Sequence, residues 1–316
     1  MGIFITLILT DLFIWWMLLR DLRHRSKAVL VFVITFKSFL TLTLLALIIS
    51  LIFCRANFAS PSNAFRIIVF GSIAALTVTI GLTYSFIRVT TRLLNRYLQR
   101  RLSFLFWINI TLSGLVVMVF ADGYFRQRFD LSIIRRDISI TGLDPRLEGL
   151  KIVLISDLHL SSYYGHYDKL VIAMDSVNEL KPDLLINTGD FITFGWQDFG
   201  EYDTILKKAV ASVGSYAIVG NHDDGTYYPD YNAAYGEECE RKVAALIGAS
   251  GYLFLSDTCV TIDYEGAPIV IGAVDTHGHH LNISYGDFAK AMKCADNSLF
   301  TLFLVHDPAA WDNILA

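Results

Sequence analysis

The sequence predicts four membrane-spanning helices followed by an α/β domain with a parallel sheet. The chain of 316 residues is 54% hydrophobic, with a mean hydropathy of +0.48, which is too apolar for an ordinary soluble protein. The excess lies in the first 121 residues, whereas short apolar runs that each end at polar residues begin near residue 150. We therefore expect transmembrane helices over 1–121, a linker with edge strands over 122–149, and a folded domain over 150–316.

Four apolar segments are long enough, or nearly so, to cross a bilayer: Gly2–Leu19, Ala28–Cys54, Ile67–Ile87 and Phe104–Ala121. The first is not a signal peptide, because no basic residue precedes it and four follow it between Arg20 and Lys27. Buried helices of a soluble core are the alternative, but such helices need a polar face. The first, third and fourth segments barely have one.

Basic residues indicate which side of the membrane each loop occupies. The loop over 20–27 carries four Lys or Arg residues and the loop over 88–101 carries five, whereas the loop between them carries Arg55 and Arg66. Loops rich in Lys and Arg stay in the cytoplasm. We therefore expect a multi-pass cell (inner) membrane protein whose folded domain lies outside the cytoplasm.

Two charged residues interrupt the first two apolar segments. Asp11 lies nine residues before Arg20 and Lys37 lies ten residues after Lys27, so both are about 14–15 Å from the cytoplasmic ends of their helices. A charge at this depth costs about 2.5–3.5 kcal/mol and usually faces a partner or a cavity. The matching depth favours an ion pair or a shared polar site. The alternative is that Lys37 reaches towards the interface and Asp11 is protonated, each alone.

The folded domain begins with three apolar runs, KIVLIS, PDLLIN and SYAIVG. Between the first two, apolar residues at helical spacing predict a helix over 169–180. A strand, a helix and a strand of these lengths form a unit with a parallel sheet, in which ligands bind at the carboxyl ends of the strands. The residues at those ends can bind metal ions: Asp157 and His159, then Gly189-Asp190, then Gly220-Asn221-His222-Asp223.

These residue types suit a metal centre. Asp157 and His159 are two apart, so in a strand both side chains would face the same side. Gly189 lets the backbone come close to an ion, while Asn221 offers a neutral oxygen and His222 a titratable nitrogen. Mixed His, Asp and Asn ligands suit Mn, Fe or Zn rather than Ca or Mg. Two divalent ions facing two carboxylates leave a positive site, which suits a phosphate ester.

The motifs D-x-H, G-D and G-N-H-D, together with the later His306 in LFLVHDP, resemble those of the calcineurin-like metallophosphoesterases. The resemblance covers roughly Leu131 to the end of the chain. It implies an α/β domain with a two-layered β-sandwich flanked by helices. It also implies a membrane-anchored hydrolase that uses two metal ions, about 3.5–4 Å apart, to act on phosphomonoester or phosphodiester bonds.

The resemblance also implies a role for each candidate ligand. Asp157 and His159 are expected to hold the first metal, and Asp190 is expected to bridge the two. Asn221 and His306 are expected to hold the second metal. All five residues follow apolar runs that we expect to be strands.

His222 is implied as the catalytic residue that assists the leaving group or the transition-state charge. Members of the family often have an Asp shortly after G-D that orients this histidine. The corresponding run here is GDFITFG, in which that partner is missing. Asp223 is a possible substitute.

The family pattern closes with a G-H-x-H motif that supplies two further metal ligands. Ten residues follow His306 and they contain no such motif, so we expect a fragment in which Trp311–Leu315 leads into a further strand. The cluster over 276–280, THGHH, resembles the motif but precedes His306, which favours a loop. The alternative function is a non-catalytic membrane protein that keeps the fold with an incomplete metal site.

The rest of the domain gives weaker signals. Alternating apolar residues between Leu131 and Ile140 indicate one or two edge strands. Later patterns predict helices over 233–247 and 285–293, and strands over 258–263, 268–273 and 299–305.

Cysteines and net charge add little to the functional assignment. Cys239, Cys259 and Cys294 lie in the domain, where one disulfide and buried thiols are both compatible with the pattern. A net charge of −4 offers no basic stripe for nucleic acid, so we expect no nucleic-acid partner. The expected partners are the lipid bilayer and a phosphate-ester substrate, possibly a lipid-linked one.

Overall fold

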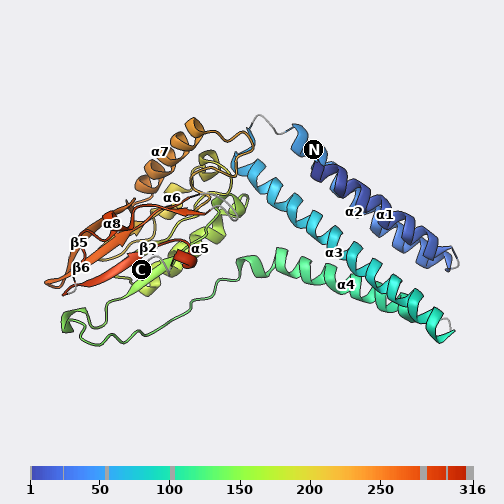
Figure 1. Cartoon of the computed structure of the whole chain (residues 1–316), viewed down its shortest axis with the longest axis horizontal. Helices are drawn as coiled ribbons and strands as arrows, with labels where there is room; N and C mark the ends of the chain where they lie inside the picture. Colours follow the sequence, from blue (N-terminus) through green and yellow to red (C-terminus); the bar gives the residue numbers. More distant parts are fainter. Residues whose placement is uncertain are drawn as a thin grey trace. The chain divides into compact units, whose positions relative to one another are not determined.

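The computed structural model describes residues 2–23, 25–53, 57–99, 104–277, 283–296 and 298–310. The chain divides into two compact units (Figure 1). The first comprises Met1–Ala56 and Arg66–Ser132, and the second comprises Asn57–Phe65 and Ile133–Ala316.

The first unit is helical. Its helices are α1 (Gly2–Leu22), α2 (Lys27–Phe53), α3 (Pro61–Leu98), which begins in the second unit, and α4 (Phe104–Phe125). Among the described residues, three stretches are long and apolar enough to cross a membrane: Lys27–Ser50, Pro61–Leu98 and Phe104–Phe129.

The expectation of four spans is corrected to three candidate spans. Helix α1 forms as predicted, but its described side chains, over 5–22, include the charged residues Asp11, Arg20 and Asp21. Each of the three candidate spans contains an 18-residue window with at most two charged residues. The three charged residues of α1 exceed this number, so α1 is not among the candidate spans.

Asp11 of α1 and Lys37 of α2 form an ion pair in the core of the helical unit, which confirms the predicted pairing. The Thr41 hydroxyl donates to the second Asp11 carboxylate oxygen at 2.8 Å, so both oxygens have a partner. Both charged residues are buried, with Asp11 4% and Lys37 7% exposed. A second pair, between Asp21 and Arg88 at 2.6 Å, joins α1 to α3.

The prediction of edge strands between Leu131 and Ile140 is wrong. Residues 130–140 form no strand, and Ile134 and Ile138 are 75% and 79% exposed. Alternation of apolar and polar residues favours a strand only where a neighbouring strand can pair with it. The described part of the chain offers this segment no such partner.

The described residues of the second unit form two larger sheets and a two-stranded one. In the first sheet, β1 (Ile152–Ile155), β2 (Leu184–Asn187), β3 (Gly214–Ala217) and β4 (Leu253–Phe254) run parallel in that order, which confirms the predicted parallel sheet. The second sheet has β6 (Ala267–Ala273) between antiparallel β5 (Thr258–Tyr264) and parallel β9 (Phe300–Leu304). The third pairs β7 (Thr276–His277) with β8 (Ser284–Tyr285).

The two larger sheets enclose a common core. Ile186 of β2, Ile269 of β6 and Leu304 of β9 belong to one buried apolar cluster. A second cluster lies on the other face of the parallel sheet, where Met174 of α5 (Tyr167–Leu180), Leu206 of α6 (Asp203–Leu206) and Val243 of α7 (Ala233–Ala249) are buried. The domain is thus layered as helices, parallel sheet and mixed sheet.

Two predicted elements near the end of the chain differ from or lie beyond the described structure. The helix predicted over 285–293 is only α8 (Phe288–Ala291), because residues 284–285 pair as β8 instead. The segment Trp311–Leu315, expected to lead into a further strand, lies outside the described residues.

The loop between α2 and α3 contributes to the second unit. The ring of Phe58 lies edge-to-face against Phe194 and Tyr228, with centroids 5.3 and 5.9 Å apart. Phe65 contacts Tyr164 at 6.1 Å. Residues 57–65 therefore pack with the domain that begins near residue 133.

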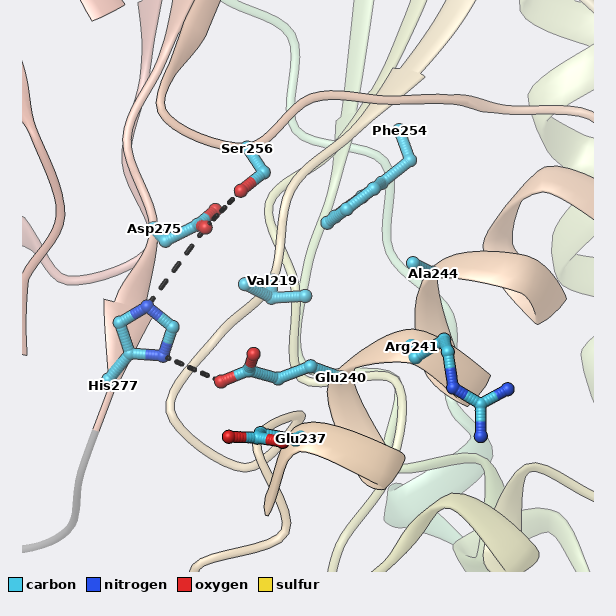
Figure 2. Close-up of a pocket in the computed structure, with 9 residues that line it drawn as sticks. All are labelled: Val219, Glu237, Glu240, Arg241, Ala244, Phe254, Ser256, Asp275 and His277. Atoms are coloured by element: carbon cyan, nitrogen blue, oxygen red, sulfur yellow. Dashed lines mark hydrogen bonds and ion pairs between the residues drawn. The ribbon is translucent and has the colours of Figure 1, made fainter. Parts of the chain in front are cut away.

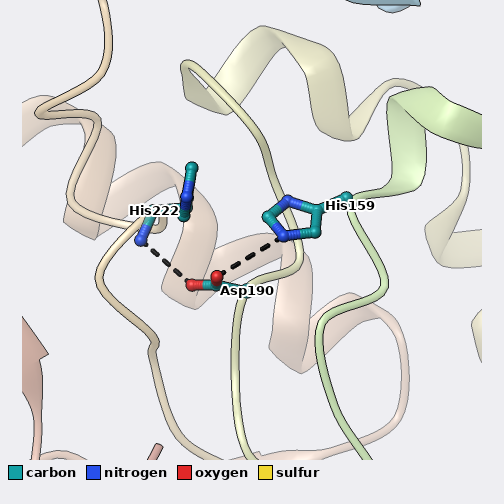
Figure 3. A group of neighbouring side chains, drawn as sticks. All are labelled: His159, Asp190 and His222. Atoms are coloured by element: carbon teal, nitrogen blue, oxygen red, sulfur yellow. Dashed lines mark hydrogen bonds and ion pairs between the residues drawn. The ribbon is translucent and has the colours of Figure 1, made fainter. Parts of the chain in front are cut away.

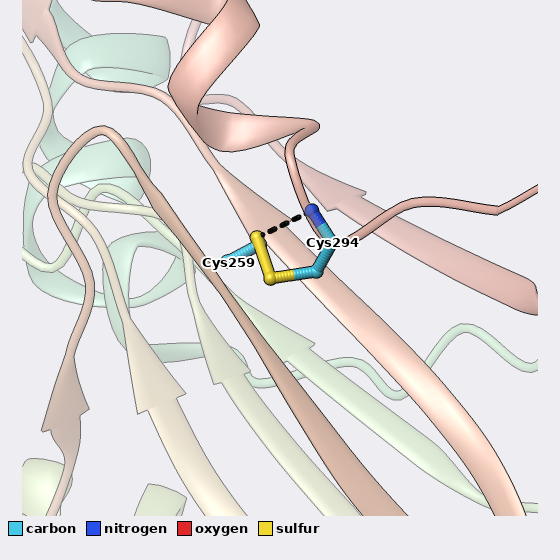
Figure 4. Close-up of a disulfide and its surroundings, with 2 residues drawn as sticks. All are labelled: Cys259 and Cys294. Carbon is cyan, nitrogen blue, oxygen red and sulfur yellow. Dashed lines mark hydrogen bonds between the residues drawn. A yellow bond between two sulfur atoms is a disulfide. The ribbon is translucent and has the colours of Figure 1, made fainter.

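Cys259 of β5 and Cys294 form a disulfide that ties the mixed sheet to the segment after α8 (Figure 4). Of the alternatives left open by the sequence, the described domain thus contains one disulfide and one buried thiol, Cys239. Burial raises the pKa of the Cys239 thiol well above its usual range. Cys54 lies outside the described residues.

Candidate metal centre

The seven predicted site residues come from the carboxyl ends of four strands. Asp157 and His159 follow β1, Asp190 follows β2, residues 221–223 follow β3, and His306 follows β9. The structure brings ligand atoms of Asp157, Asp190 and His306 within 4.8 Å of one another, and does the same for His159, Asp190 and His222. Asp190 belongs to both groups.

Asp190 lies at the centre of the arrangement (Figure 3). Its Oδ2 is 3.5 Å from Nε2 of His159 and 3.6 Å from Nε2 of His306. Its Oδ1 accepts the backbone N–H of His222 at 3.0 Å. The side chain is almost fully buried, so its charge is screened little by water.

The three imidazoles are oriented in the same way. Nδ1 of His159 contacts the Ile192 carbonyl at 3.1 Å, Nδ1 of His222 contacts the Thr193 carbonyl at 2.7 Å, and Nδ1 of His306 contacts the Thr188 carbonyl at 2.9 Å. A carbonyl only accepts, so each Nδ1 carries the proton and each Nε2 is left with its lone pair. Histidines that bind metal ions are held in this way by a backbone carbonyl or carboxylate.

This arrangement fits divalent cations. The bare Nε2 atoms of His159 and His306 and the carboxylate of Asp190 are all electron-pair donors, and each Nε2 lies 3.5–3.6 Å from Oδ2 of Asp190. Two ligand atoms at about 2.1 Å from one ion, at a tetrahedral angle, are about 3.4 Å apart. The spacing is thus what a shared cation requires, and the donor types suit Mn, Fe or Zn.

The backbone at the strand ends is locally strained. Asp157, His159 and Asp190 have φ values of 54°, 41° and 57°. Residues other than glycine adopt this backbone region at a cost of about 1–3 kcal/mol. Gly189 has a φ of 102°, and a Cβ there would lie 2.2 Å from the backbone nitrogen of Gly220. Only glycine allows the second and third strand ends to approach so closely.

Asp223 supports the backbone rather than His222, contrary to the sequence-based expectation. Its Oδ2 accepts the N–H groups of Asp190 and Gly220 at 2.8 and 2.9 Å, and its Oδ1 accepts that of Ile192 at 3.1 Å. The contact that orients His222 comes from the Thr193 carbonyl instead. Asp223 is fully buried. Burial, and then the nearby Asp190, raise its pKa well above the usual value.

Burial also lowers the pKa of His159, while the negative charge of Asp190 opposes this effect. A lowered pKa keeps the imidazole neutral, which is the form that binds a metal ion.

Asn221 and His306 line a pocket with a volume of about 630 Å³, together with Asp157, Thr188 and Tyr227. The amide Nδ2 of Asn221 donates to the Tyr227 hydroxyl at 3.1 Å. The pocket thus opens onto the candidate ligands, and it is large enough for a phosphate group and part of its substituent.

Two residues that hold the loops around the candidate site were not predicted from the sequence. Asp198, in the short 3₁₀ helix η5 (Trp196–Phe199), accepts the N–H groups of Thr193 and Phe194, both at 2.9 Å. Burial raises the pKa of Asp198 to about 7. Neither Asp198 nor Tyr227 lies in a motif. A signal for Asp198 is its separation by five residues from Thr193, because Asp side chains often accept hydrogen bonds from nearby backbone N–H groups in turns.

A second pocket, of about 310 Å³, lies beside α7 and contains His277 (Figure 2). The ring of His277 lies between two carboxylates, with Nδ1 3.7 Å from Glu240 and Nε2 4.0 Å from Asp275. This pocket shares none of the candidate ligands. His277 belongs to β7 rather than to a loop, and residues 278–280 of the THGHH cluster lie outside the described structure.

Comparison with known proteins gives a consistent family assignment. The family model for calcineurin-like phosphoesterases matches residues 150–309. The chain is 31% identical over 166 residues to the uncharacterized metallophosphoesterase YkuE of Bacillus subtilis (strain 168), an alignment that covers 52% of each chain.

Two further relatives match shorter stretches. The UDP-2,3-diacylglucosamine pyrophosphatase LpxG of Chlamydia muridarum (strain MoPn / Nigg) is 36% identical over 98 residues, which cover 31% of this chain and 30% of the relative. A transmembrane protein with metallophosphoesterase domain from Danio rerio is 33% identical over 91 residues, or 29% of this chain and 21% of the relative. The chain thus spans about half or less of the length of these relatives.

Proposed function

This chain belongs to the calcineurin-like phosphoesterase family, and we propose that its second unit hydrolyses phosphomonoester or phosphodiester bonds with the help of two divalent metal ions. One observation carries the proposal. Three imidazoles, each with its Nδ1 against a backbone carbonyl, surround the buried carboxylate of Asp190, and two of them point Nε2 at the same oxygen. Burial of these electron-pair donors around a carboxylate costs free energy unless cations bind between them.

In this proposal, Asp157 and His159 hold the first ion, Asn221 and His306 hold the second, and Asp190 is shared. Asp190 belongs to both groups of neighbouring ligand atoms, which supports its role as the shared ligand. The groups themselves place Asp157 beside His306 and His159 beside His222, so the assignment of the other ligands to each ion rests on the family resemblance. Two bound divalent ions supply positive charge to the phosphoryl oxygens during hydrolysis. Manganese, iron and zinc suit the mixture of nitrogen and oxygen ligands.

His222 handles the proton in this scheme. Its Nδ1 is held by the Thr193 carbonyl at 2.7 Å, so Nε2 is the atom that can exchange a proton with the substrate. A protonated Nε2 would donate to the oxygen of the leaving group as the ester bond breaks, or would stabilise negative charge on a phosphoryl oxygen.

We further propose that this chemistry takes place at the outer surface of the membrane. The basic stretch over 88–101 includes the end of α3 (to Leu98) and precedes α4. We expect this stretch in the cytoplasm, so the domain after α4 lies on the opposite side of the membrane. Residues 57–65, which follow α2, belong to the same unit as the domain and must share its side. The disulfide between Cys259 and Cys294 suits an oxidising compartment.

A phosphate ester on a lipid-linked molecule is the substrate class that fits this position. The name of one relative, UDP-2,3-diacylglucosamine pyrophosphatase, describes a phosphate linkage on an acylated sugar. The candidate spans would hold the domain near the bilayer, where such molecules are concentrated.

Hydrolysis of bis-p-nitrophenyl phosphate with added manganese tests the proposal, with Asp190→Ala as the inactive variant. We expect measurable release of p-nitrophenol from the detergent-solubilised chain and a loss of at least about 100-fold in the variant, because the shared ligand is removed. Equal rates in the two proteins would contradict an enzymatic role. They would favour the alternative of a membrane protein that keeps the fold without catalysis.

A further inference from the structure

Tyr227 contacts two residues of the proposed site at once. Its ring is stacked on the imidazole of His222, with centroids 3.9 Å apart and planes at 4°. Its hydroxyl accepts a hydrogen bond from Nδ2 of Asn221 at 3.1 Å. Tyr227 also lines the pocket that contains Asp157 and His306.

The contact with Asn221 determines which end of the amide can face a metal ion. A side-chain amide binds a cation through its oxygen, and its NH₂ group then needs an acceptor elsewhere. The Tyr227 hydroxyl provides that acceptor. With Nδ2 held in this way, Oδ1 is the end that remains for the cation.

The contact with His222 limits rotation of the imidazole. The Thr193 carbonyl holds Nδ1, the Tyr227 ring covers one face at 3.9 Å, and His159 lies edge-to-face against it at 4.8 Å. Rotation of the His222 ring would break both the stacking and the hydrogen bond. The direction of Nε2 is therefore determined by three contacts, one of which is the stacked ring of Tyr227.

We infer that Tyr227 is a positioning residue for the hydrolysis, which presents Oδ1 of Asn221 to the second metal ion and directs Nε2 of His222 to the leaving group. The inference rests on the proposed function, since it names a residue that acts through two members of that site. The hydroxyl serves Asn221 and the ring serves His222, so the two actions can be separated by mutation.

Three variants of the full chain in detergent separate these actions. Tyr227→Phe removes the hydroxyl and keeps the ring, whereas Tyr227→Leu removes both. Tyr228→Phe is the matched control, because Tyr228 is the neighbouring tyrosine and stacks instead on Tyr235, with centroids 4.5 Å apart.

The first readout is manganese binding by isothermal titration calorimetry, which does not depend on activity. We expect Tyr227→Phe to weaken the affinity of one of the two ions by about 10-fold or more, as removal of a partner that orients a ligand usually does. The affinity of the other ion and both affinities in Tyr228→Phe should match wild type. Wild-type affinities in Tyr227→Phe, or an equal loss in Tyr228→Phe, would overturn the role assigned to the hydroxyl.

The second readout is kcat at saturating manganese on two phosphodiesters, one with a p-nitrophenol leaving group and one with a methanol leaving group. A displaced His222 should matter most where the leaving oxygen needs a proton. We therefore expect Tyr227→Leu to reduce kcat on the methyl ester at least about 10-fold more than on the aryl ester, while Tyr227→Phe reduces both alike. An equal reduction on both esters in Tyr227→Leu would overturn the role assigned to the ring.

These outcomes are distinct from failure of the proposed function. If wild type and Asp190→Ala hydrolyse the aryl ester equally, the enzymatic proposal fails. The calorimetric comparison of Tyr227→Phe with Tyr228→Phe still decides whether the hydroxyl orients Asn221.

Discussion

Asp223 accepts the backbone N–H of Asp190 through Oδ2 at 2.8 Å. Asp223 follows β3 and Asp190 follows β2, so this hydrogen bond fixes the position of the residue at the centre of the site. The same oxygen accepts the N–H of Gly220 at 2.9 Å, and Oδ1 accepts that of Ile192 at 3.1 Å. One buried side chain thus determines the positions of two strand ends, and this relationship leads to the first prediction.

Asp223→Ala should destabilise the domain and prevent metal binding. The change leaves three buried N–H groups without an acceptor, at about 1–3 kcal/mol each, so we expect a loss of at least about 3 kcal/mol in the free energy of unfolding. Urea unfolding followed by tryptophan fluorescence measures the loss. The exposed Asp230→Ala provides the control. A loss below about 1 kcal/mol for Asp223→Ala would contradict this account of the three hydrogen bonds.

The meeting of the candidate ligands could be predicted from sequence because each follows an apolar run that becomes a strand, and parallel strands bring their carboxyl ends together. Asp157, Asp190 and His306 come from three different strands, yet their ligand atoms lie within 4.8 Å of one another. The order of motifs was sufficient to anticipate that these residues meet at one site, but it paired Asp157 with His159 and His306 with Asn221 rather than Asp157 with His306.

The residues that orient these ligands could not be predicted. Asp198 and Tyr227 act through contacts with Thr193, Asn221 and His222, and no spacing in the sequence indicates that such loops will meet. The expected role of Asp223 failed for the same reason, since its proximity in sequence to His222 did not reveal that its oxygens would be occupied by backbone N–H groups.

The edge-strand prediction failed for a different reason. The alternation between Leu131 and Ile140 is real, but a strand also needs a partner, which the segment lacks among the described residues. In the helical unit, by contrast, the pairing of Asp11 with Lys37 could be predicted from depth alone, because two helices joined by a short loop must lie side by side.

Asp198→Asn should change how stability depends on pH. Burial raises the pKa of Asp198 from 3.8 to about 7, so the folded state holds a proton that the unfolded state releases between these values. The free energy of unfolding should therefore decrease as pH rises from about 4 to about 7, by an amount on the order of 4 kcal/mol from this group, and level off above.

The Asp198→Asn variant has no carboxyl group at this position, so its stability lacks this dependence on pH. The stability difference between wild type and Asp198→Asn, measured by urea unfolding from pH 4 to pH 8 in a chelator, should shift in favour of the variant as pH rises. The exposed Asp168→Asn is the matched control and should follow wild type. A difference that stays constant with pH would contradict the raised pKa.

Asp11→Ala and Lys37→Ala should each destabilise the helical unit, because each leaves a buried charge without its partner. Removal of one member of a buried ion pair costs about 3–5 kcal/mol. The double variant should recover part of the sum, which thermal unfolding in detergent would reveal. Lys27→Ala, at the exposed start of α2, is the control. Strictly additive losses in the double variant would show that the two residues act independently.

The location of the domain can be tested by cysteine labelling in intact cells. Ser212→Cys, at an exposed position in the domain, should react with a membrane-impermeant maleimide without permeabilisation. Arg96→Cys, in the last turn of α3, should react only after permeabilisation. The reverse pattern would place the domain in the cytoplasm and would favour a substrate from that compartment.

The number of bound metal ions shows whether the centre is dinuclear and shared through Asp190. The purified full chain would be stripped with a chelator, reloaded with manganese, desalted and measured by inductively coupled plasma mass spectrometry. A dinuclear centre of this kind predicts two ions per wild-type chain, two in Asp168→Asn, and at most one in Asp190→Asn, because an amide is a poor bridging ligand. A single ion in wild type, or two ions in Asp190→Asn, would contradict it.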